Sequence, residues 1–189
     1  MKFDYVTVNT GYVLRRLRAP DIETVGRIVA GAFGSEEIGE EVTTMMRHYC
    51  ASGRADLDLD EQETEPLPSE YWVLEDIRGG KLFGISGLYR FAWAWKRSFW
   101  LGWFAVSAEE HGKGLGTLML QSLLRIAKTK GCEVCKVETA RGGRATRFYE
   151  RNGFAVEGIL SKHYSSQLDA QVLSRSMEDI QSIPSSATA

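Results

Sequence analysis

The sequence predicts one α/β domain, because runs with the pattern of strands alternate with runs with the pattern of helices. The clearest sign is the stretch from Phe99 to Gly131, where an apolar run of strand length is followed by a glycine turn and a helical segment. A second sign is the Arg78-Gly79-Gly80 turn between two further apolar runs, which is typical of a hairpin. A chain of 189 residues is long enough to bury a core without disulfides.

The glycine turn is the most informative local feature. Gly112, Gly114 and Gly116 stand at alternate positions, with Lys113 between the first two. Glycine has no Cβ, so the backbone can bend tightly and bring its N–H groups against a ligand, and the free N–H groups of the following helical turn favour an anion. We therefore predict an anion site of pyrophosphate size at the end of the 99–106 strand.

The N-terminal part of the chain predicts one strand and two helices. Tyr12–Leu17 has the composition of a strand, Asp21 is an N-cap candidate for the first helix, and Ser35 begins the second. Apolar residues recur at helical spacing in both helices and predict their buried faces. These residues are Ile22, Val25, Ile28, Val29 and Phe33 in the first helix, and Ile38, Val42, Met45, Met46 and Tyr49 in the second.

The C-terminal part alternates in the same way. Glu133–Thr139 reads as a buried strand, 142–154 as a helix stopped by Gly153, and 157–166 and 171–177 as a closing pair of strands. The Ser-rich end, 182–189, is predicted to be a disordered tail behind a single domain of residues 1–181.

Composition excludes several classes of protein. A formal charge of −2 gives no reason to expect a nucleic-acid partner, and no apolar run has the length of a membrane span. No secretory leader is recognisable and cysteines are few, so we expect a cytoplasmic protein. Cys132 and Cys135 form a lone C-x-x-C whose side chains are expected on opposite faces of a strand. With the three histidines scattered, no metal site is predicted.

Two nucleotide fingerprints can be tested against the turn, and both fail. The Walker pattern needs a hydroxyl residue after the lysine, and the dinucleotide pattern needs G-x-G-x-x-G after a first strand. The turn instead reads His-Gly-Lys-Gly-Leu-Gly over residues 111–116. It resembles the coenzyme A turn of the GNAT N-acetyltransferase family, Gln/Arg-x-x-Gly-x-Gly/Ala, with His111 at the first position.

A second motif carries the same resemblance. The family's last coenzyme-contacting helix, Asn-x-x-Ala-x-x-Phe-Tyr-x-x-x-Gly-Phe, is matched at Ala145, Phe148, Tyr149, Gly153 and Phe154, with Gly142 in place of the asparagine. Each motif is weak alone, but they occur in the family's order, separated by one strand. The resemblance implies a mixed, strongly bent sheet of about six or seven strands flanked by helices.

The resemblance also implies an activity, which is acetyl transfer from acetyl-CoA to a primary amine by direct attack in a ternary complex. The acceptor is expected to be a small molecule, with a protein N-terminus or lysine left open, and the protein is expected to be a monomer or homodimer. From a different class, a noncatalytic acyl-CoA-binding or sensor domain remains an alternative.

The resemblance assigns residues to the coenzyme and to catalysis. Backbone N–H groups near the bulged end of the 98–106 strand would stabilise the oxyanion, and the turn would hold the pyrophosphate. Tyr149 would protonate the departing thiolate, since a phenol with a pKa near 10 can donate at neutral pH. Its alternative role is packing with Phe148. The coenzyme-binding residues implied are Phe104, Ala105, Val106, His111, Gly112, Lys113, Gly114, Leu115, Gly116, Thr117, Ala145 and Phe148.

The general base and the acceptor surface are left open by the sequence. Glu36, Glu37, Glu70 and Glu138 are candidates for the base, each with an ordinary surface role as the alternative. The acidic stretch 56–65 is either a solvated loop or a lip that attracts a cationic amine. The strand tryptophans Trp93, Trp95, Trp100 and Trp103 either fill the core or line the acceptor pocket.

Overall fold

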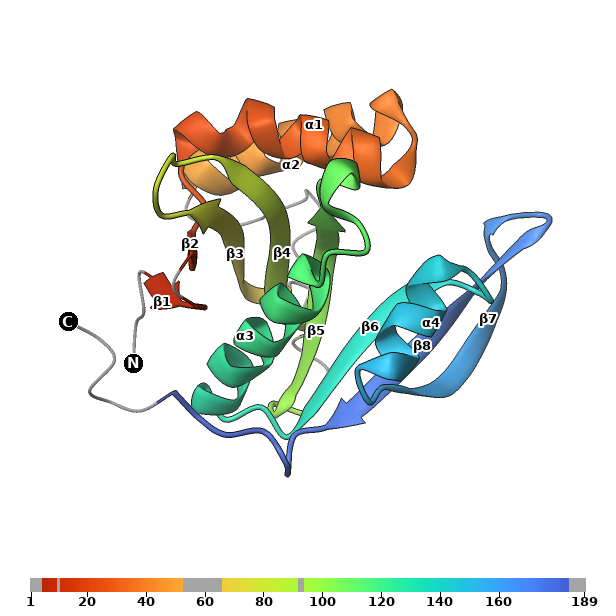
Figure 1. Cartoon of the computed structure of the whole chain (residues 1–189). Coiled ribbons are helices and arrows are strands. Elements are labelled where there is room, and N and C mark those ends of the chain that lie inside the picture. Colours follow the sequence, from red (N-terminus) through yellow and green to blue (C-terminus); the bar gives the residue numbers. More distant parts are fainter. Residues whose placement is uncertain (1–4, 10, 53–65, 92–93, 184–189) are drawn as a thin grey trace.

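The computed structural model describes residues 5–9, 11–52, 66–91 and 94–183 (Figure 1). The strands are β1 (Tyr5–Thr7), β2 (Tyr12–Arg16), β3 (Pro66–Asp76), β4 (Leu82–Phe91), β5 (Ser98–Val106), β6 (Val134–Ala140), β7 (Ala155–Ser165) and β8 (Leu168–Ser176). The helices are α1 (Ile22–Phe33), α2 (Glu36–Ser52), α3 (Leu115–Thr129) and α4 (Arg144–Arg151).

All the described strands belong to one mixed sheet with the order β1-β2-β3-β4-β5-β6-β8-β7. Neighbouring strands are antiparallel except β5 and β6, which are parallel and joined through α3. The predicted mixed sheet flanked by helices is confirmed. The described sheet has eight strands where about six or seven were expected, because a short N-terminal strand, Tyr5–Thr7, pairs with β2.

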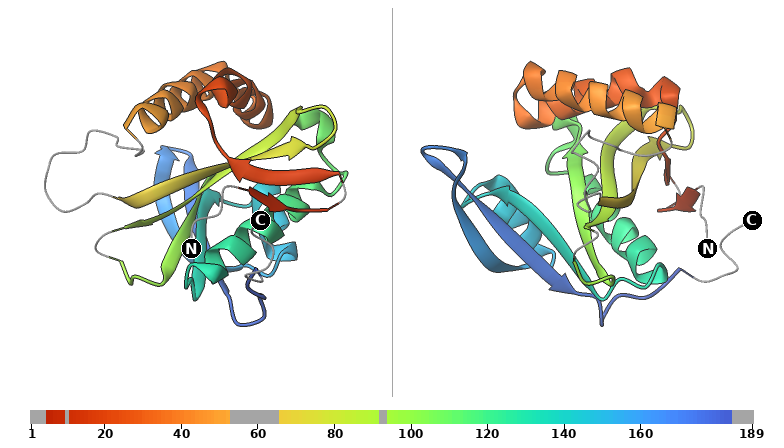
Figure 2. Two further views of the ribbon diagram at one scale, coloured as in Figure 1. Left: turned by 90° about the vertical axis from the view of Figure 1, so that its left-hand side faces the viewer. Right: turned by 180° about the vertical axis from the view of Figure 1, so that it is seen from behind.

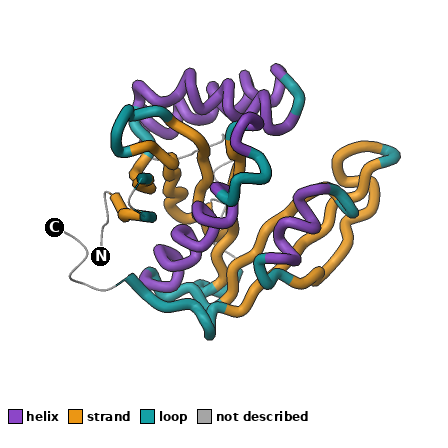
Figure 3. Tube along the Cα trace, viewed as in Figure 1, coloured by secondary structure: helices purple, strands orange, loops and turns teal. Residues whose placement is uncertain are grey.

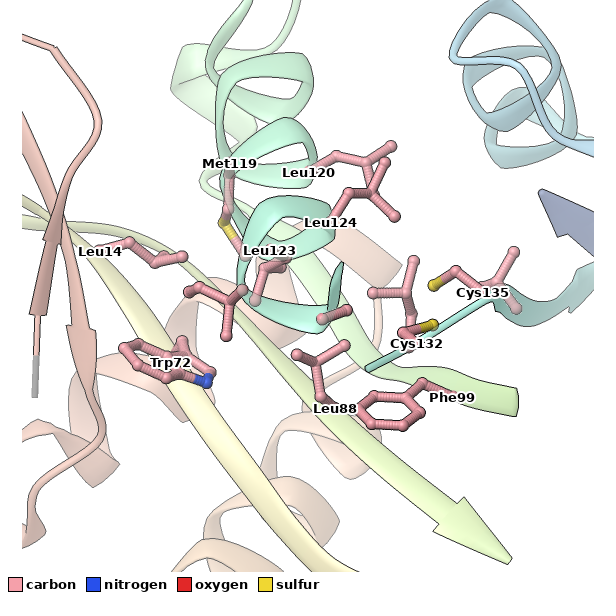
Figure 4. Packing of buried hydrophobic residues seen from close by; sticks show 14 of the residues in the cluster. Leu14, Trp72, Leu88, Phe99, Met119, Leu120, Leu123, Leu124, Cys132 and Cys135 are labelled. Atoms are coloured by element: carbon pink, nitrogen blue, oxygen red, sulfur yellow. The ribbon is translucent and has the colours of Figure 1, made fainter. Parts of the chain in front are cut away.

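Helices cover both faces of the sheet, as the turned views in Figure 2 and the tube in Figure 3 show. On one face, α3 buries Met119, Leu120, Leu123 and Leu124, and Figure 4 shows them beside Trp72 and other sheet residues. On the other face, α1 and α2 enclose a separate core. Its fully buried members include Val25, Val29, Val42, Met46 and Ile85. The predicted apolar helix faces are therefore the buried ones.

Two details of the N-terminal helices differ from the predictions. Asp21 occupies the N-cap position of α1, but its side chain makes no cap. Its carboxylate instead accepts hydrogen bonds from Arg15 at 2.7 and 2.9 Å and from the Arg18 N–H at 2.8 Å. Phe33 was expected inside, yet half of its surface is exposed, because it ends α1; its ring lies 6.0 Å from the Trp103 ring.

The prediction that the Cys132 and Cys135 side chains lie on opposite faces of a strand was wrong. Cys132 precedes β6, so the alternation of a strand does not apply to it. Both thiols are buried (Figure 4) and hydrogen-bonded to each other, which lowers the pKa of Cys132 and raises that of Cys135. The Cys132 thiol also contacts the Val134 carbonyl at 3.2 Å. Both cysteines belong to the core beneath α3.

Some sequence features lie outside the described residues. These are the acidic stretch 56–65, Trp93, and residues 184–189 of the predicted tail. Ile183, at the start of that tail, is buried, and its N–H donates to the Thr129 hydroxyl at 2.9 Å. None of the helices in the described ranges combines the length and apolar character needed to cross a membrane.

Candidate functional site

The sheet opens between β5 and β6. Their register pairs only Ser98–Trp100 with Val134–Lys136, and beyond these three pairs the strands diverge (Figure 1). On this side of β5, the described chain supplies no strand partner for the backbone from Leu101 to Val106. Backbone N–H and C=O groups without a strand partner are available to a ligand. The opening is therefore a gap in the hydrogen bonding of the sheet, bounded by two fixed strands.

A β-bulge directs the side chains that border this opening. In the pairing of β4 with β5, Gly87 faces Gly102 and Ile85 faces Ala105, so β5 contains one extra residue. Trp103 takes a φ of 45°, which is rare for a bulky residue. Leu101 faces the α3 core, and regular alternation would put Trp103 on the same side. The extra residue instead turns Trp103 to the α1–α2 core, and Phe104 lies against the α3 core.

The glycine turn follows β5 directly and is tied to its end. The His111 Nε2 atom lies 2.9 Å from the Val106 carbonyl oxygen. Gly112 and Gly114 adopt φ values of 81° and 84°, which side chains rarely tolerate. Gly114 then begins α3 with no side-chain cap among the described residues, so N–H groups of the first helical turn are available to an anion.

The positive charge at the glycine turn is smaller than Lys113 alone implied, because this lysine is paired with Glu110. Lys113 Nζ lies 3.2 Å from the Glu110 carboxylate in the preceding turn. The lysine is exposed, so this pair contributes little to stability, but it offsets part of the positive potential that an anion would meet. The backbone N–H groups and the positive end of the α3 dipole are then the main features that favour an anion here.

Helix α4 closes the opening from the α3 side of the sheet. Its Phe148 ring lies 5.5 Å from Phe104, and a Cβ on Gly116 would lie 3.3 Å from Phe148, so the first turn of α3 also touches α4. Ala145 is exposed at the start of the helix. The structure thus brings the predicted coenzyme residues together in three adjoining segments: the end of β5, the turn with the start of α3, and α4.

Tyr149 is buried within this aromatic group. Its ring lies 5.1 Å from Phe148, 5.4 Å from Phe154 and 6.1 Å from Phe104. Burial raises the pKa of Tyr149 above its ordinary value, and the nearby Cys135 raises it further. The phenol is therefore a neutral proton donor over the whole physiological range. This geometry fits the acid role and the packing role that the sequence left open.

Sequence reasoning missed the polar contacts that fix α4 on the sheet. The buried Gln171 side-chain amide on β8 donates to the Thr146 hydroxyl at 2.6 Å, and that hydroxyl lies 3.3 Å from the Ala140 carbonyl on β6. These contacts hold α4 against the two strands beyond the opening. Their partners are distant in the sequence, so no local pattern announces them.

The candidate base Glu70 is held by two cations away from the opening. Its Oε1 accepts hydrogen bonds from Arg16 and Lys130, each at 2.9 Å. Lys130 follows the C-terminus of α3, about 22 Å along this helix from the glycine turn. Burial disfavours the charged carboxylate, but the hydrogen bonds from Lys130 and Arg16 outweigh it and lower the pKa of Glu70. These contacts give Glu70 a structural role.

Replacing Glu70 with glutamine is expected to lower the free energy of unfolding at neutral pH by about 1.5–3 kcal/mol, the range for hydrogen bonds to charged groups. Because the pKa of Glu70 is lower in the folded chain, its contribution is complete above an unfolded pKa of about 4.3. This contribution to stability is lost as the pH falls through the pKa that Glu70 has in the folded chain. Urea titrations at neutral and acidic pH measure both effects. Exposed Glu36→Gln is the control, and equal stability of the two variants would contradict the prediction.

Within the described ranges, no group of three His, Cys, Asp or Glu residues is placed to hold a metal ion. The remaining candidate bases differ in position. Glu36 and Glu37 are exposed in the first turn of α2, whereas Glu138 lies on β6, beyond its last pair with β5.

Comparison with known proteins identifies the family. Residues 39–154 match the Acetyltransferase (GNAT) family, and this match covers more than half of the chain. The protein therefore belongs to the GNAT acetyltransferase family, as the two motifs predicted. No curated protein matches the sequence significantly.

Solved structures share the fold at low sequence identity. An acetyltransferase of the GNAT family from Bacillus anthracis has a TM-score of 0.68 at 12% identity, covering 93% of this chain and 99% of that one. A spermidine/spermine N-acetyltransferase from Vibrio cholerae has a TM-score of 0.62 at 18% identity, covering 90% and 95%. An acetyltransferase from Salmonella typhimurium that modifies the N-terminal serine of a ribosomal protein has a TM-score of 0.66 at 13% identity, covering 91% and 98%.

Proposed function

We propose that this protein transfers an acetyl group from acetyl-CoA to the primary amine of a small molecule. The observation that carries the proposal is the opening between β5 and β6 with the left-handed glycine turn anchored beside it. GNAT acetyltransferases use acetyl-CoA as cosubstrate, and this chain belongs to that family. The turn and the opening supply the two things such a cosubstrate needs, an anion site and a slot for an extended arm.

The residues present fit the coenzyme. Side chains at Gly112 and Gly114 would strain a backbone with positive φ and would occupy the surface where a pyrophosphate approaches the N–H groups. Beyond Trp100, the free edge of β5 offers backbone groups to the pantetheine amides. We assign the oxyanion to backbone N–H groups between Phe104 and Val106, at the end of this free edge.

Bound acetyl-CoA supplies the acetyl thioester, and the chain's own residues orient it and move protons. Tyr149 is assigned as the acid that protonates the leaving thiolate, because its phenol is neutral and packs against Phe104 and Phe148 at the wall of the opening. The raised pKa keeps the phenol protonated until the thiolate forms beside it, and the excess proton of the attacking nitrogen then restores the phenol.

The proposal is tested by thermal unfolding with acetyl-CoA, CoA, NADPH and ATP, each in large excess. A ligand at about one hundred times its Kd adds about 2.7 kcal/mol to stability, which raises Tm by roughly 5–10 °C in a chain of this size. We expect acetyl-CoA and CoA to give this shift. Stabilisation by NADPH or ATP alone would refute the assignment of the turn.

A panel of amines, followed by thiol release, separates the enzyme from its alternatives. The noncatalytic acyl-CoA-binding domain is favoured by one observation, the close packing of Tyr149 among three rings. It predicts coenzyme binding with no turnover on any amine or peptide. Turnover only on peptides would shift the acceptor class to a protein N-terminus or lysine. A cytoplasmic location and a monomeric or dimeric state stay predictions.

A further inference from the structure

Glu138 lies at the opening, on the face of the sheet opposite α3 and α4. Its neighbours Cys135 and Val137 are buried in the core beneath α3, so the alternation of β6 turns Glu138 to the other face. The last β6 residue paired with β5 is Lys136. Glu138 is two residues further, about 7 Å along the strand, where β5 and β6 have separated.

Two side chains from β7 fix one oxygen of this carboxylate. The Tyr164 hydroxyl donates to Glu138 Oε1 at 3.0 Å, and His163 Nε2 lies 3.2 Å from the same oxygen. Within the described chain, Oε2 has no such partner. The side chain is 30% exposed. One oxygen is therefore oriented by the protein while the other is available to a ligand.

An irregularity in β7 makes this arrangement possible. Consecutive residues of a regular strand point to opposite faces, so His163 and Tyr164 would not reach the same oxygen. The register of β7 with β8 shifts between Leu160 and Ser165, and Lys162 takes a φ of 55°. A bulge of this kind re-aims side chains. The local backbone is thus arranged so that both residues meet Glu138.

Tyr89, on β4 across the opening, is near enough to Glu138 to be affected by its charge. Burial, and next the charge of Glu138, raise the pKa of Tyr89 on β4 to about 12. The Tyr89 ring stacks on Trp100 with the centroids 6.4 Å apart. The nearby cation Lys136 is already paired with Glu157 at 2.7 Å. Glu138 thus lies among aromatic side chains, an environment that favours a cation.

Resting on the proposed function, we propose that Glu138 binds the ammonium group of the acceptor and accepts its proton. An alkylammonium with a pKa near 10.4 is almost fully protonated at neutral pH and cannot attack a thioester. Glu138 Oε2 takes one proton and passes it to solvent. The acceptor's carbons would lie against the rings of Tyr89 and Tyr164.

Loss of this proton prepares the amine for transfer of the acetyl group. The neutral nitrogen forms a bond to the acetyl carbonyl carbon, the carbon–sulfur bond breaks, and the thiolate leaves with the electron pair. The thiolate takes the Tyr149 proton, and the second excess proton of the nitrogen restores the phenol. The acceptor is thus a cationic primary amine that enters from the face of the sheet opposite α4.

The test compares Glu138→Gln with Glu133→Gln, using the amine on which the wild type is most active. Glu133 precedes the same strand and pairs with Arg97, outside the opening. We expect Glu138→Gln to lower kcat/KM for the amine about tenfold or more at neutral pH, at the lower end of the range for general bases. Glu133→Gln should match the wild type, and both should keep the wild-type Kd for acetyl-CoA.

The pH profile separates proton transfer from a structural effect. As the pH rises toward the pKa of the free amine, the acceptor loses its proton in solution, so the deficit of Glu138→Gln should shrink. The groups facing Glu138 are Tyr89, His163 and Tyr164, with Lys136 and its partner Glu157 beside them, and all five are unchanged in both variants.

The possible failures are distinguishable. No transfer by the wild type to any amine would refute the proposed function itself. Transfer by the wild type with an equally active Glu138→Gln would refute only the role of Glu138. A deficit that is the same at every pH, or one that is accompanied by weaker acetyl-CoA binding, would also overturn that role. Glu138→Asp, which keeps the charge, should recover part of the lost activity.

Discussion

Replacing Tyr149 with phenylalanine is expected to lower kcat for acetyl transfer by about 100-fold or more, the usual contribution of a general acid. The phenol is buried and its pKa is raised, so in the wild type it carries a proton throughout the physiological range. Phenylalanine keeps the ring contacts with Phe104, Phe148 and Phe154. We therefore expect Tm and the Kd for acetyl-CoA to stay at their wild-type values. Steady-state thiol release measures kcat.

Tyr12→Phe is the matched control for this substitution. Tyr12 lies on β2, where its ring contacts Phe83 at 5.7 Å, and β2 is separated from β5 by two strands. Removal of its hydroxyl should leave kcat unchanged. If Tyr149→Phe were as active as Tyr12→Phe, the tyrosine would have only its packing role.

The second large effect is expected from Gly114→Val, which should raise KM for acetyl-CoA about 30-fold. A φ of 84° is not available to a β-branched residue without strain, so the turn must change its path. The change would cost the pyrophosphate about one charge-assisted hydrogen bond, or roughly 2 kcal/mol. Initial rates at varied acetyl-CoA concentration measure this KM.

Gly131→Val provides a control for strain alone. Gly131 has a φ of 88° and, like Gly114, would place a Cβ in open space, but it lies at the opposite end of α3. Both variants should lose comparable stability in urea, whereas only Gly114→Val should change KM. An equal rise of KM in both variants would show that the effect comes from altered folding. It would refute the assignment of the glycine turn to the pyrophosphate of the coenzyme.

The parts of the fold that were predictable are those encoded over short distances. The turn at Gly112 and Gly114 was recognisable because its positive φ values favour glycine. The buried faces of α1 and α2 were recognisable because apolar residues recur at helical spacing. The same local signals located the Arg78-Gly79-Gly80 hairpin. In each case the residues that produce the feature lie within a few positions of one another in the sequence.

The parts that were not predictable depend on contacts across the sheet. Glu138 on β6 meets Tyr164 on β7 although β8 lies between the two strands and 26 residues separate them in the sequence. The sequence therefore left four carboxylates as equal candidates for the base. The predicted direction of the Cys132 side chain was wrong for a related reason. The alternation of side chains along a strand can be applied only when the first residue of the strand is known, and β6 begins after Cys132.

The three residue pairs that join β5 to β6 divide the groups proposed for catalysis between two lobes of the molecule. The glycine turn belongs to the N-terminal lobe, strands β1–β5 with α1–α3. Tyr149 and Glu138 belong to the C-terminal lobe, strands β6–β8 with α4. The distance between the proposed coenzyme site and the groups assigned to proton transfer therefore depends on these three pairs and on the packing of Phe148 against Phe104. We expect a substitution in the short joint from Ser98 to Trp100 to lower turnover, because it would shift one lobe against the other.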